Sequence, residues 1–232
     1  MEKGKDLEDL DARELNELGN AYGGHGMWEE AIGSYLRSLA LRKAEGDTRG
    51  QGIVLNNLGA VYYNQGRWQE ALECYEGGRQ IAHQFGDKVS ELAALMNVVF
   101  LHFTRGQEEE FLRQATEAQE LALASKRWEP LSKLSWLQGR LALASSTAYE
   151  EGLIHYADAL RYAAREGETT LMEMIGRVHR QAEDLLSKGS RGMALVLYDY
   201  LLAFVRDQGF SEKVQAHLAG KREEILRRPS LA

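Results

Sequence analysis

The stretch LGAVYYNQGRWQEALECYEGG, residues 58–78, decides the fold. On both sides of Asn64-Gln65-Gly66, apolar or small residues recur three and four positions apart, which is the period of an amphipathic helix. The central tripeptide is a turn signal, because glycine adopts positive φ at no steric cost. The stretch therefore predicts two helices joined by a tight turn, with small residues where the backbones approach and large ones around that contact. The residues of this pattern are Leu58, Gly59, Tyr62, Ala71, Tyr75 and Gly78.

The same pattern recurs five times along the chain at intervals of 40 to 42 residues. We expect the units to start at or just before their first helices, at Ala12, Gly52, Leu92, Lys133 and Ile175. We expect their second helices to begin at Trp28, Trp68, Glu108, Tyr149 and Arg191. The predicted organisation is one array over residues 1–232, with repeats at about 12–51, 52–91, 92–132, 133–174 and 175–210 and a capping helix at 211–228.

Glycines mark the ends of the predicted helices, because glycine is the favoured residue just past a helix. The turns inside the hairpins carry Gly26, Gly66, Gly106 and Gly189, with Thr147 as the exception. The ends of the second helices carry Gly46, Gly86, Gly167 and Gly209, with Lys126 as the exception.

Each second helix should carry a small residue where it crosses the first helix of its hairpin. A large residue is expected four positions later. The small places hold Ala31, Ala71, Phe111, Gly152 and Ala194, and the large places hold Tyr35, Tyr75, Ala115, Tyr156 and Tyr198. The two sizes are exchanged in the third unit, which conserves total volume and predicts a shifted but equally dense contact.

This pattern resembles the tetratricopeptide repeat (TPR) consensus, although Leu55 replaces the leading tryptophan and Gly78 the last alanine. The period and the Leu-Gly-Asn-Ala-Tyr at 18–22 are similar to the 40-residue TPR subfamily of polarity scaffolds and maltose-activator-type regulators. The resemblance covers about residues 12–210. It implies an all-α superhelix, a TPR solenoid of about five hairpins, whose first helices line a concave groove that binds a peptide or helix of another protein.

Composition narrows the class of partner. The net charge is −7 and the pI about 5.5, which argues against nucleic acid or an anionic membrane as the partner. The sequence shows neither a signal peptide nor an apolar run long enough to span a membrane. The lone Cys74 is expected to be a small core residue, and a reducing cytoplasmic location fits.

The residues that could carry chemistry are scattered. The six histidines do not have the spacing of a helical zinc site, and Gly23-Gly24-His25-Gly26 lacks the lysine of a phosphate-binding loop. Glu108-Glu109-Glu110 is interpreted as a solvated first turn, with calcium binding as a remote alternative. We therefore expect no catalytic residues, no metal site and no cofactor, and no enzymatic activity.

A row of asparagines and aromatic residues is expected on the groove face of the first helices. Asparagine is a poor helix former, so its repetition on one face suggests a role other than helix stability, such as bonding to a peptide backbone. The alternative is that these asparagines bond to neighbouring helices and that the phenylalanines belong to the core. The predicted groove residues are Asn16, Asn20, Asn56, Asn57, Tyr63, Asn64, Asn97, Phe100, Phe103, Gln138 and Leu141.

TPR co-chaperones hold acidic tails of heat-shock proteins with two asparagines and several basic residues. Here Asn20 and Asn57 stand at the asparagine places, but Asn16, Ala93 and Asn97 occupy the basic ones, so no such clamp is expected.

The sequence therefore favours a non-enzymatic interaction module that binds a peptide or helix of a partner. One alternative is a regulatory or effector-sensing segment of a larger signalling or transcription-regulating protein. The other is a self-assembly scaffold, a homo-oligomer in which another copy's terminal helix fills the groove.

Overall fold

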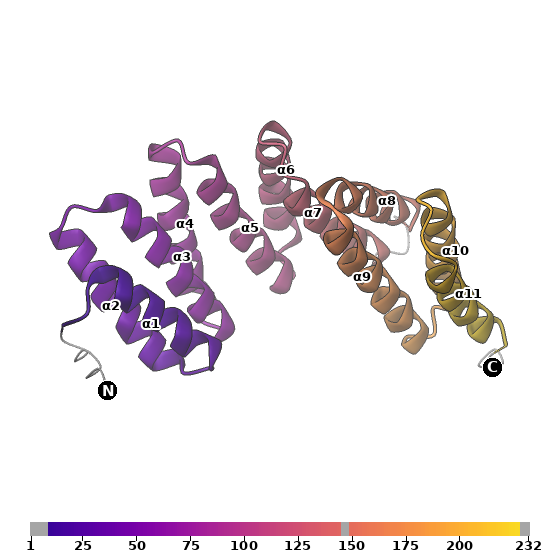
Figure 1. The fold of residues 1–232 in the computed structure, drawn as a ribbon, viewed down its shortest axis with the longest axis horizontal. Coiled ribbons are helices and arrows are strands. Elements are labelled where there is room, and N and C mark those ends of the chain that lie inside the picture. Colours follow the sequence, from indigo (N-terminus) through magenta and orange to yellow (C-terminus); the bar gives the residue numbers. More distant parts are fainter. Residues whose placement is uncertain (1–8, 145–148, 228–232) are drawn as a thin grey trace. The chain divides into compact units, whose positions relative to one another are not determined.

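The computed structural model describes residues 9–144 and 149–227, with the side chain of Tyr149 outside the described set. These residues form eleven helices and no strand, arranged as helical hairpins (Figure 1), so the predicted all-α class is confirmed. The helices are α1 Ala12–Gly24, α2 Trp28–Ala44, α3 Thr48–Asn64, α4 Trp68–Gln84, α5 Lys88–Thr104, α6 Glu108–Ala124, α7 Trp128–Ala144, α8 Tyr149–Glu166, α9 Glu168–Ser187, α10 Arg191–Asp207 and α11 Glu212–Arg227.

The second helices begin at the five predicted residues, but most first helices begin earlier than the predicted unit starts. α3 and α5 begin at Thr48 and Lys88, because the preceding aspartates cap them. Asp47 accepts a hydrogen bond from Gly50 N at 2.8 Å, and Asp87 accepts one from Ser90 N at 3.1 Å. These N–H bonds hold the pKa of both carboxyls below its usual value.

The predicted turn glycines all adopt positive φ. Gly66, in the turn of the opening stretch, has φ 73°, and the other seven glycines also lie in this region. Lys126, the predicted exception, adopts the same conformation with φ 52°. The fold therefore requires a left-handed residue at this link even where the sequence does not supply glycine. Thr147 lies outside the described residues.

Tyrosine rings cover small residues inside the first two hairpins. A Cβ atom at Gly59 would lie 2.7 Å from ring carbons of Tyr75, and one at Gly19 would lie 2.6 Å from the Tyr35 ring. Such distances are too short for carbon–carbon packing, so each ring occupies space that only glycine leaves open. Figure 1 shows the two paired hairpins, α1–α2 and α3–α4.

In the third hairpin the sizes are exchanged, as predicted. Phe111 is fully buried and its ring meets the edge of Phe103 at a centroid distance of 5.4 Å. Ala115 stands at the tyrosine place, and Val99 stands at the glycine place of the first helix; both are fully buried. On α6 the large residue has moved to the small place, and on α5 Val99 fills the glycine place, so the core stays filled.

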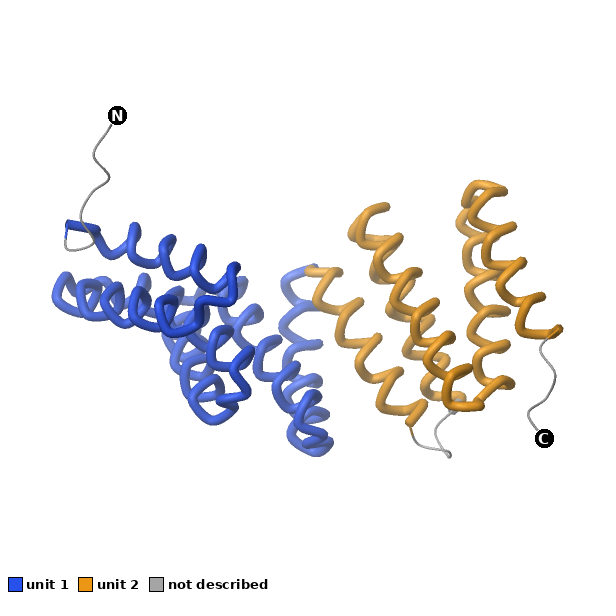
Figure 2. Tube along the Cα trace, turned by 90° about the horizontal axis from the view of Figure 1, so that it is seen from below, with its two compact units in different colours: residues 1–126 blue, residues 127–232 orange. Residues whose placement is uncertain are grey.

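The chain divides into two compact units, unit 1 at residues 1–126 and unit 2 at 127–232 (Figure 2). Unit 1 contains α1–α6, and its buried residues cluster between successive hairpins. Unit 2 contains α7–α11, and its core is built around Tyr156 and Tyr198, both fully buried. Leu218 and Ile225 of α11 are buried in that core, whereas Leu226 is exposed.

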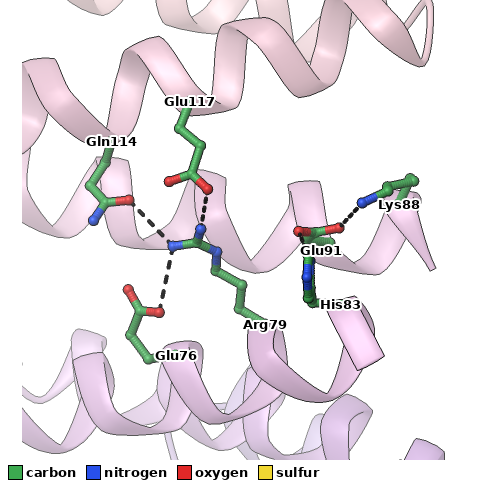
Figure 3. Close-up of polar contacts among 7 residues, drawn as sticks. All are labelled: Glu76, Arg79, His83, Lys88, Glu91, Gln114 and Glu117. Carbon is green, nitrogen blue, oxygen red and sulfur yellow. Dashed lines mark hydrogen bonds and ion pairs between the residues drawn. The ribbon is translucent and has the colours of Figure 1, made fainter. Parts of the chain in front are cut away.

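Polar contacts join neighbouring helices in unit 1 (Figure 3). Arg79 on α4 bonds to Glu117 and Gln114 on α6 and pairs with Glu76 on its own helix. A second cluster joins α4 to α5, where buried Glu91 lies 2.8 Å from both His83 Nδ1 and Lys88 Nζ. These contacts link α4 to both α5 and α6.

In the parts of the chain that the structure describes, no helix is long and apolar enough to cross a membrane.

Candidate functional site

The first helices of unit 1, α1, α3 and α5, are joined by asparagine pairs. Asn57 Nδ2 on α3 donates to Asn16 Oδ1 on α1 at 3.0 Å, and Asn97 Nδ2 on α5 donates to Asn56 Oδ1 on α3 at 2.9 Å. Each bond links residues 41 positions apart, so the repeat period itself brings the amides together. These four asparagines therefore bond to neighbouring helices, which is the alternative that the sequence left open for them.

The other predicted groove residues of α1 and α3 have different surroundings. Asn20 is exposed, and its Oδ1 accepts a hydrogen bond from Tyr35 Oη at 2.7 Å. Tyr63 Oη lies 2.6 Å from Thr104 Oγ1 on α5, and its ring meets the edge of Trp68. Asn64, the last residue of α3, is exposed. Asn20 and Tyr63 therefore already have structural partners.

The aromatic part of the predicted row is split. Phe100 is half-buried on α5, whereas Phe103 packs against Phe111 on α6 and so contributes to the hairpin core. Gln138 and Leu141 are half-buried on α7 in unit 2. Whether any member of the row contacts a ligand stays a prediction.

A pocket of about 200 Å³ opens in unit 1 between the first half of α3, the end of α4 and the first half of α5; we call it the α3–α5 pocket. Its apolar walls include Ile53 and Phe85, whose exposed fractions are 53% and 51%. Asn56 and Asn57, whose amides are bonded to Asn97 and Asn16, also line it. The full lining is Arg49, Gly52, Ile53, Asn56, Asn57, Gly78, Ile81, Ala82, Phe85, Asp87, Ser90, Ala93 and Ala94.

The charged groups at this pocket neutralise one another. Arg49 lies 3.6 Å from Asp87, and its guanidinium carbon lies 5.9 Å from the Phe85 ring centroid. Asp87 is also occupied as the N-cap of α5. The pocket therefore offers apolar surface and amide groups and little net charge.

Sequence reasoning identified Asn56 and Asn57 but missed Arg49, Ile53 and Phe85. Ile53 directly precedes the core residue Val54 and Phe85 is a helix C-cap, so neither stands out in the helical period. Both residues could have been found as large apolar residues at positions that the helical period assigns to the surface. A cluster of such exposed residues marks an interaction site.

In unit 2 the first helices carry different groups. The guanidinium carbons of Arg140 on α7 and Arg177 on α9 lie 5.0 and 5.1 Å from the Trp136 ring centroid, within the range of cation–π contact. Between α9 and α11 lies a second, wider opening of about 500 Å³, which we call the α9–α11 groove. It is lined by Met172, Ile175, Gly176, His179, Lys213, Val214, His217 and Leu218.

A hydrogen-bonded chain stands behind this groove. Tyr198 Oη donates to Glu183 Oε1 at 2.8 Å and lies 2.7 Å from His179 Nδ1. Because the tyrosine has one proton and gives it to the carboxylate, Nδ1 must be the donor to the tyrosine oxygen. Burial lowers the pKa of His179, so the ring is neutral at pH 7 and its Nε2 is an acceptor.

Cys74, the one cysteine, is buried on α4, and burial raises the pKa of its thiol to about 11. The group is therefore protonated at neutral pH and packs as a small apolar residue, as predicted. In the described ranges, 9–144 and 149–227, no three His, Cys, Asp or Glu side chains gather as a metal site.

Family comparisons identify the repeat. Two family models described as tetratricopeptide repeat match residues 14–49 and 50–124, so this part of the chain is similar to TPR repeats. The closer likeness to the 40-residue subfamily stays a prediction. No curated protein matches the sequence significantly.

Solved structures share the fold. The nearly identical TPR-like repeats assigned to a kinesin light chain of Podosopora anserina are 17% identical, with TM-score 0.61, over 84% of this chain and 96% of that one. A second crystal structure of those repeats, with a single substitution, is 16% identical with the same TM-score, over 85% and 95%. The Rap conjugation gene regulator of plasmid pLS20, in complex with a Phr peptide, is 13% identical with TM-score 0.63, and all of this chain matches 66% of it.

The TPR-like fold supports a protein-interaction module, and among its openings are the α3–α5 pocket of unit 1 and the α9–α11 groove of unit 2.

Proposed function

We propose that the chain is a non-enzymatic module that binds a peptide or helix of a partner protein on the first-helix face of unit 1. The observation that carries the proposal is the α3–α5 pocket, where Ile53 and Phe85 are each about half exposed beside ordered amides. Large apolar side chains at the surface cost solvation free energy, which a bound apolar group would recover.

The recognition would use two kinds of contact. An apolar side chain of the partner enters the pocket between Ile53 and Phe85, and the amides of Asn56 and Asn57 bond to the partner's backbone. Each of these amides uses one polar end in its asparagine pair, which leaves the other end for a ligand. Because the pairs hold the amides in place, less side-chain entropy is lost on binding.

The choice of a peptide ligand has support outside this chain, since the Rap regulator of similar fold is known in complex with a peptide. That protein is a regulator and extends beyond the part matched here, which favours one alternative function, a regulatory segment of a larger protein. In both cases residues 12–210 would act as one array in the cytoplasm, with protein rather than nucleic acid or membrane as the partner.

A peptide library displayed on phage tests the proposal. Peptides selected on the wild-type chain should bind Ile53→Glu at least about tenfold more weakly, because a charge would be buried under the ligand's apolar side chain. Ile154→Glu is the matched control, since Ile154 is 60% exposed on α8 and lies outside both openings.

Selected peptides that bind both variants equally well would refute the α3–α5 pocket as the site. Selection of no peptide, together with growth of particle mass with concentration in light scattering, would favour the self-assembly scaffold instead.

A further inference from the structure

The α9–α11 groove combines an apolar floor with positive charge. Met172, Ile175, Val214 and Leu218 supply the apolar surface, and Met172 is 42% exposed. Among the described residues that line the groove there is a lysine and there are two histidines, but there is no carboxylate. This lining is unusual in a chain with more acidic than basic residues.

Arg180 adds a cation beside the lining residue Gly176. A Cβ atom at Gly176 would lie 3.5 Å from Nη1 of Arg180, so the guanidinium folds back over the glycine that lines the groove. Arg180 is exposed, and so is Lys213 on the facing helix α11. A ligand in the groove would therefore meet a cation from each of the two helices.

The carboxylate of Glu183, one turn after His179 on α9, is engaged by a hydrogen bond. Glu183 accepts the Tyr198 hydrogen bond described above, while Lys221, which also acts on His179, pairs with Glu224 at 3.4 Å. Because the tyrosine contact places the proton of the neutral ring on Nδ1, the Nε2 atom of the lining residue His179 is an acceptor. The groove thus presents an acceptor for an N–H group, cations for carboxylates and an apolar floor.

We propose that the α9–α11 groove binds an acidic peptide segment of a partner protein. An aliphatic side chain of the segment lies on the apolar floor, its carboxylates pair with Arg180 and Lys213, and a backbone N–H donates to His179 Nε2. Charge complementarity selects this occupant, because neutral or basic segments would leave both cations without a partner. The proposal rests on the proposed function only in its class of ligand, since it names a separate site in unit 2.

The test uses two short fluorescein-labelled peptides and the full chain at physiological salt. In the acidic peptide leucine alternates with aspartate and glutamate, and in the neutral peptide the same leucines alternate with asparagine and glutamine. Fluorescence anisotropy should show binding of the acidic peptide at least about tenfold tighter than that of the neutral one. Charged hydrogen bonds of this kind account for such a ratio.

Three variants locate the site. Lys213→Glu should weaken binding of the acidic peptide by about tenfold or more, while Arg206→Glu on α10, which makes the same charge change outside the groove, should change it less than about threefold. Gly176→Leu should also abolish binding, because it fills the groove without changing charge. Leucine favours a helix over glycine, so this variant should stay folded, which circular dichroism checks.

Equal binding of both peptides, or equal weakening by Lys213→Glu and Arg206→Glu, would overturn the proposal in favour of non-specific attraction. Loss of the acidic peptide with Ile53→Glu but not with Lys213→Glu would place it in unit 1, which refutes this inference and leaves the proposed function intact. A mass in light scattering that rises with concentration in the wild type but not in Gly176→Leu would identify the occupant as a second copy of the chain, and would also refute a partner peptide.

Discussion

Unit 1 and unit 2 are built from the same hairpin but carry different charge. Residues 1–126 contain 13 Lys and Arg against 21 Asp and Glu, whereas residues 127–232 contain 15 against 14. The whole net negative charge of the chain therefore belongs to unit 1. Yet the first helices of unit 1 present amides and apolar groups at the α3–α5 pocket, whereas the α9–α11 groove of unit 2 is lined by apolar groups, two histidines and Lys213 of α11.

This contrast shows that the repeat constrains the inside of each hairpin and leaves its first-helix face free to vary. Buried tyrosines recur in both units, at Tyr35 and Tyr75 in unit 1 and at Tyr156 and Tyr198 in unit 2. On the first helices, by contrast, unit 1 carries asparagines, whereas unit 2 carries Arg140, Arg177 and His179. Function is expected to lie in the parts that differ.

The largest effect is expected from the shared core. Tyr75→Ala should lower the free energy of unfolding by about 3–5 kcal/mol, because it empties the space over Gly59. Hydrogen exchange should show loss of protection in α3 and α4 before the helices of unit 2. Tyr75→Phe keeps the ring and is the control; an equal loss in both variants would mean that the hydroxyl, not packing, is responsible.

The next effect tests a polar cluster of unit 1. Burial would raise the pKa of Glu91, but hydrogen bonds from Lys88 and His83 outweigh it and hold the pKa below its usual value. A lowered pKa means that the ionised carboxylate stabilises the folded chain at neutral pH, and that this contribution is lost as the pH falls through the folded-state pKa. Glu91→Gln should therefore cost about 1–3 kcal/mol at pH 7 and less at acidic pH.

Urea denaturation between neutral and acidic pH measures this difference. Glu117→Gln is the control, because Glu117 bonds to Arg79 but is half exposed and should cost less than about 1 kcal/mol. A penalty for Glu91→Gln that does not shrink in acid would contradict the assignment.

A smaller effect separates two tyrosines of unit 2. Tyr198 Oη is hydrogen-bonded to Glu183 and His179, whereas the equally buried Tyr156 Oη finds no hydrogen-bond partner among the described residues. Tyr198 and Glu183 are 15 positions apart, as are Tyr35 and its acceptor Asn20, but the residue 15 positions before Tyr156 is Leu141. Tyr198→Phe should cost about 1 kcal/mol, and Tyr156→Phe should be neutral or stabilising. Thermal unfolding that ranks the two variants in the opposite order would contradict this account.

The smallest effect concerns the link at the unit boundary. Lys126 holds positive φ where the corresponding links carry glycine, and a side chain there is strained. Lys126→Gly should stabilise unit 1 by about 0.5–1 kcal/mol, with denaturation midpoints as the measurement. Lys43→Gly removes the same charge from an exposed site in the last turn of α2 and should destabilise, so a gain in both variants would point to charge and not to backbone strain.

Much of this fold could be predicted because its signals are local. The eight positive-φ glycines and the five starts of the second helices follow from residues adjacent in sequence. The starts of α3 and α5 were predicted late, since Asp47 and Asp87 were assigned to links and not recognised as N-caps. The exchange of the small and the large residue at Phe111 and Ala115 was also predictable. The repeat period aligns these two positions with the small and large positions of the other second helices.

The sequence alone determined that about forty residues form one hairpin, since periodicity and turn residues act within a few positions of each other. Only the tertiary structure decided which asparagines bond to one another, and that Ile53 and Phe85 share a pocket, because these contacts depend on how one hairpin packs against the next. Such packing joins side chains some 30 to 40 positions apart, and no local pattern records the direction in which each of them points.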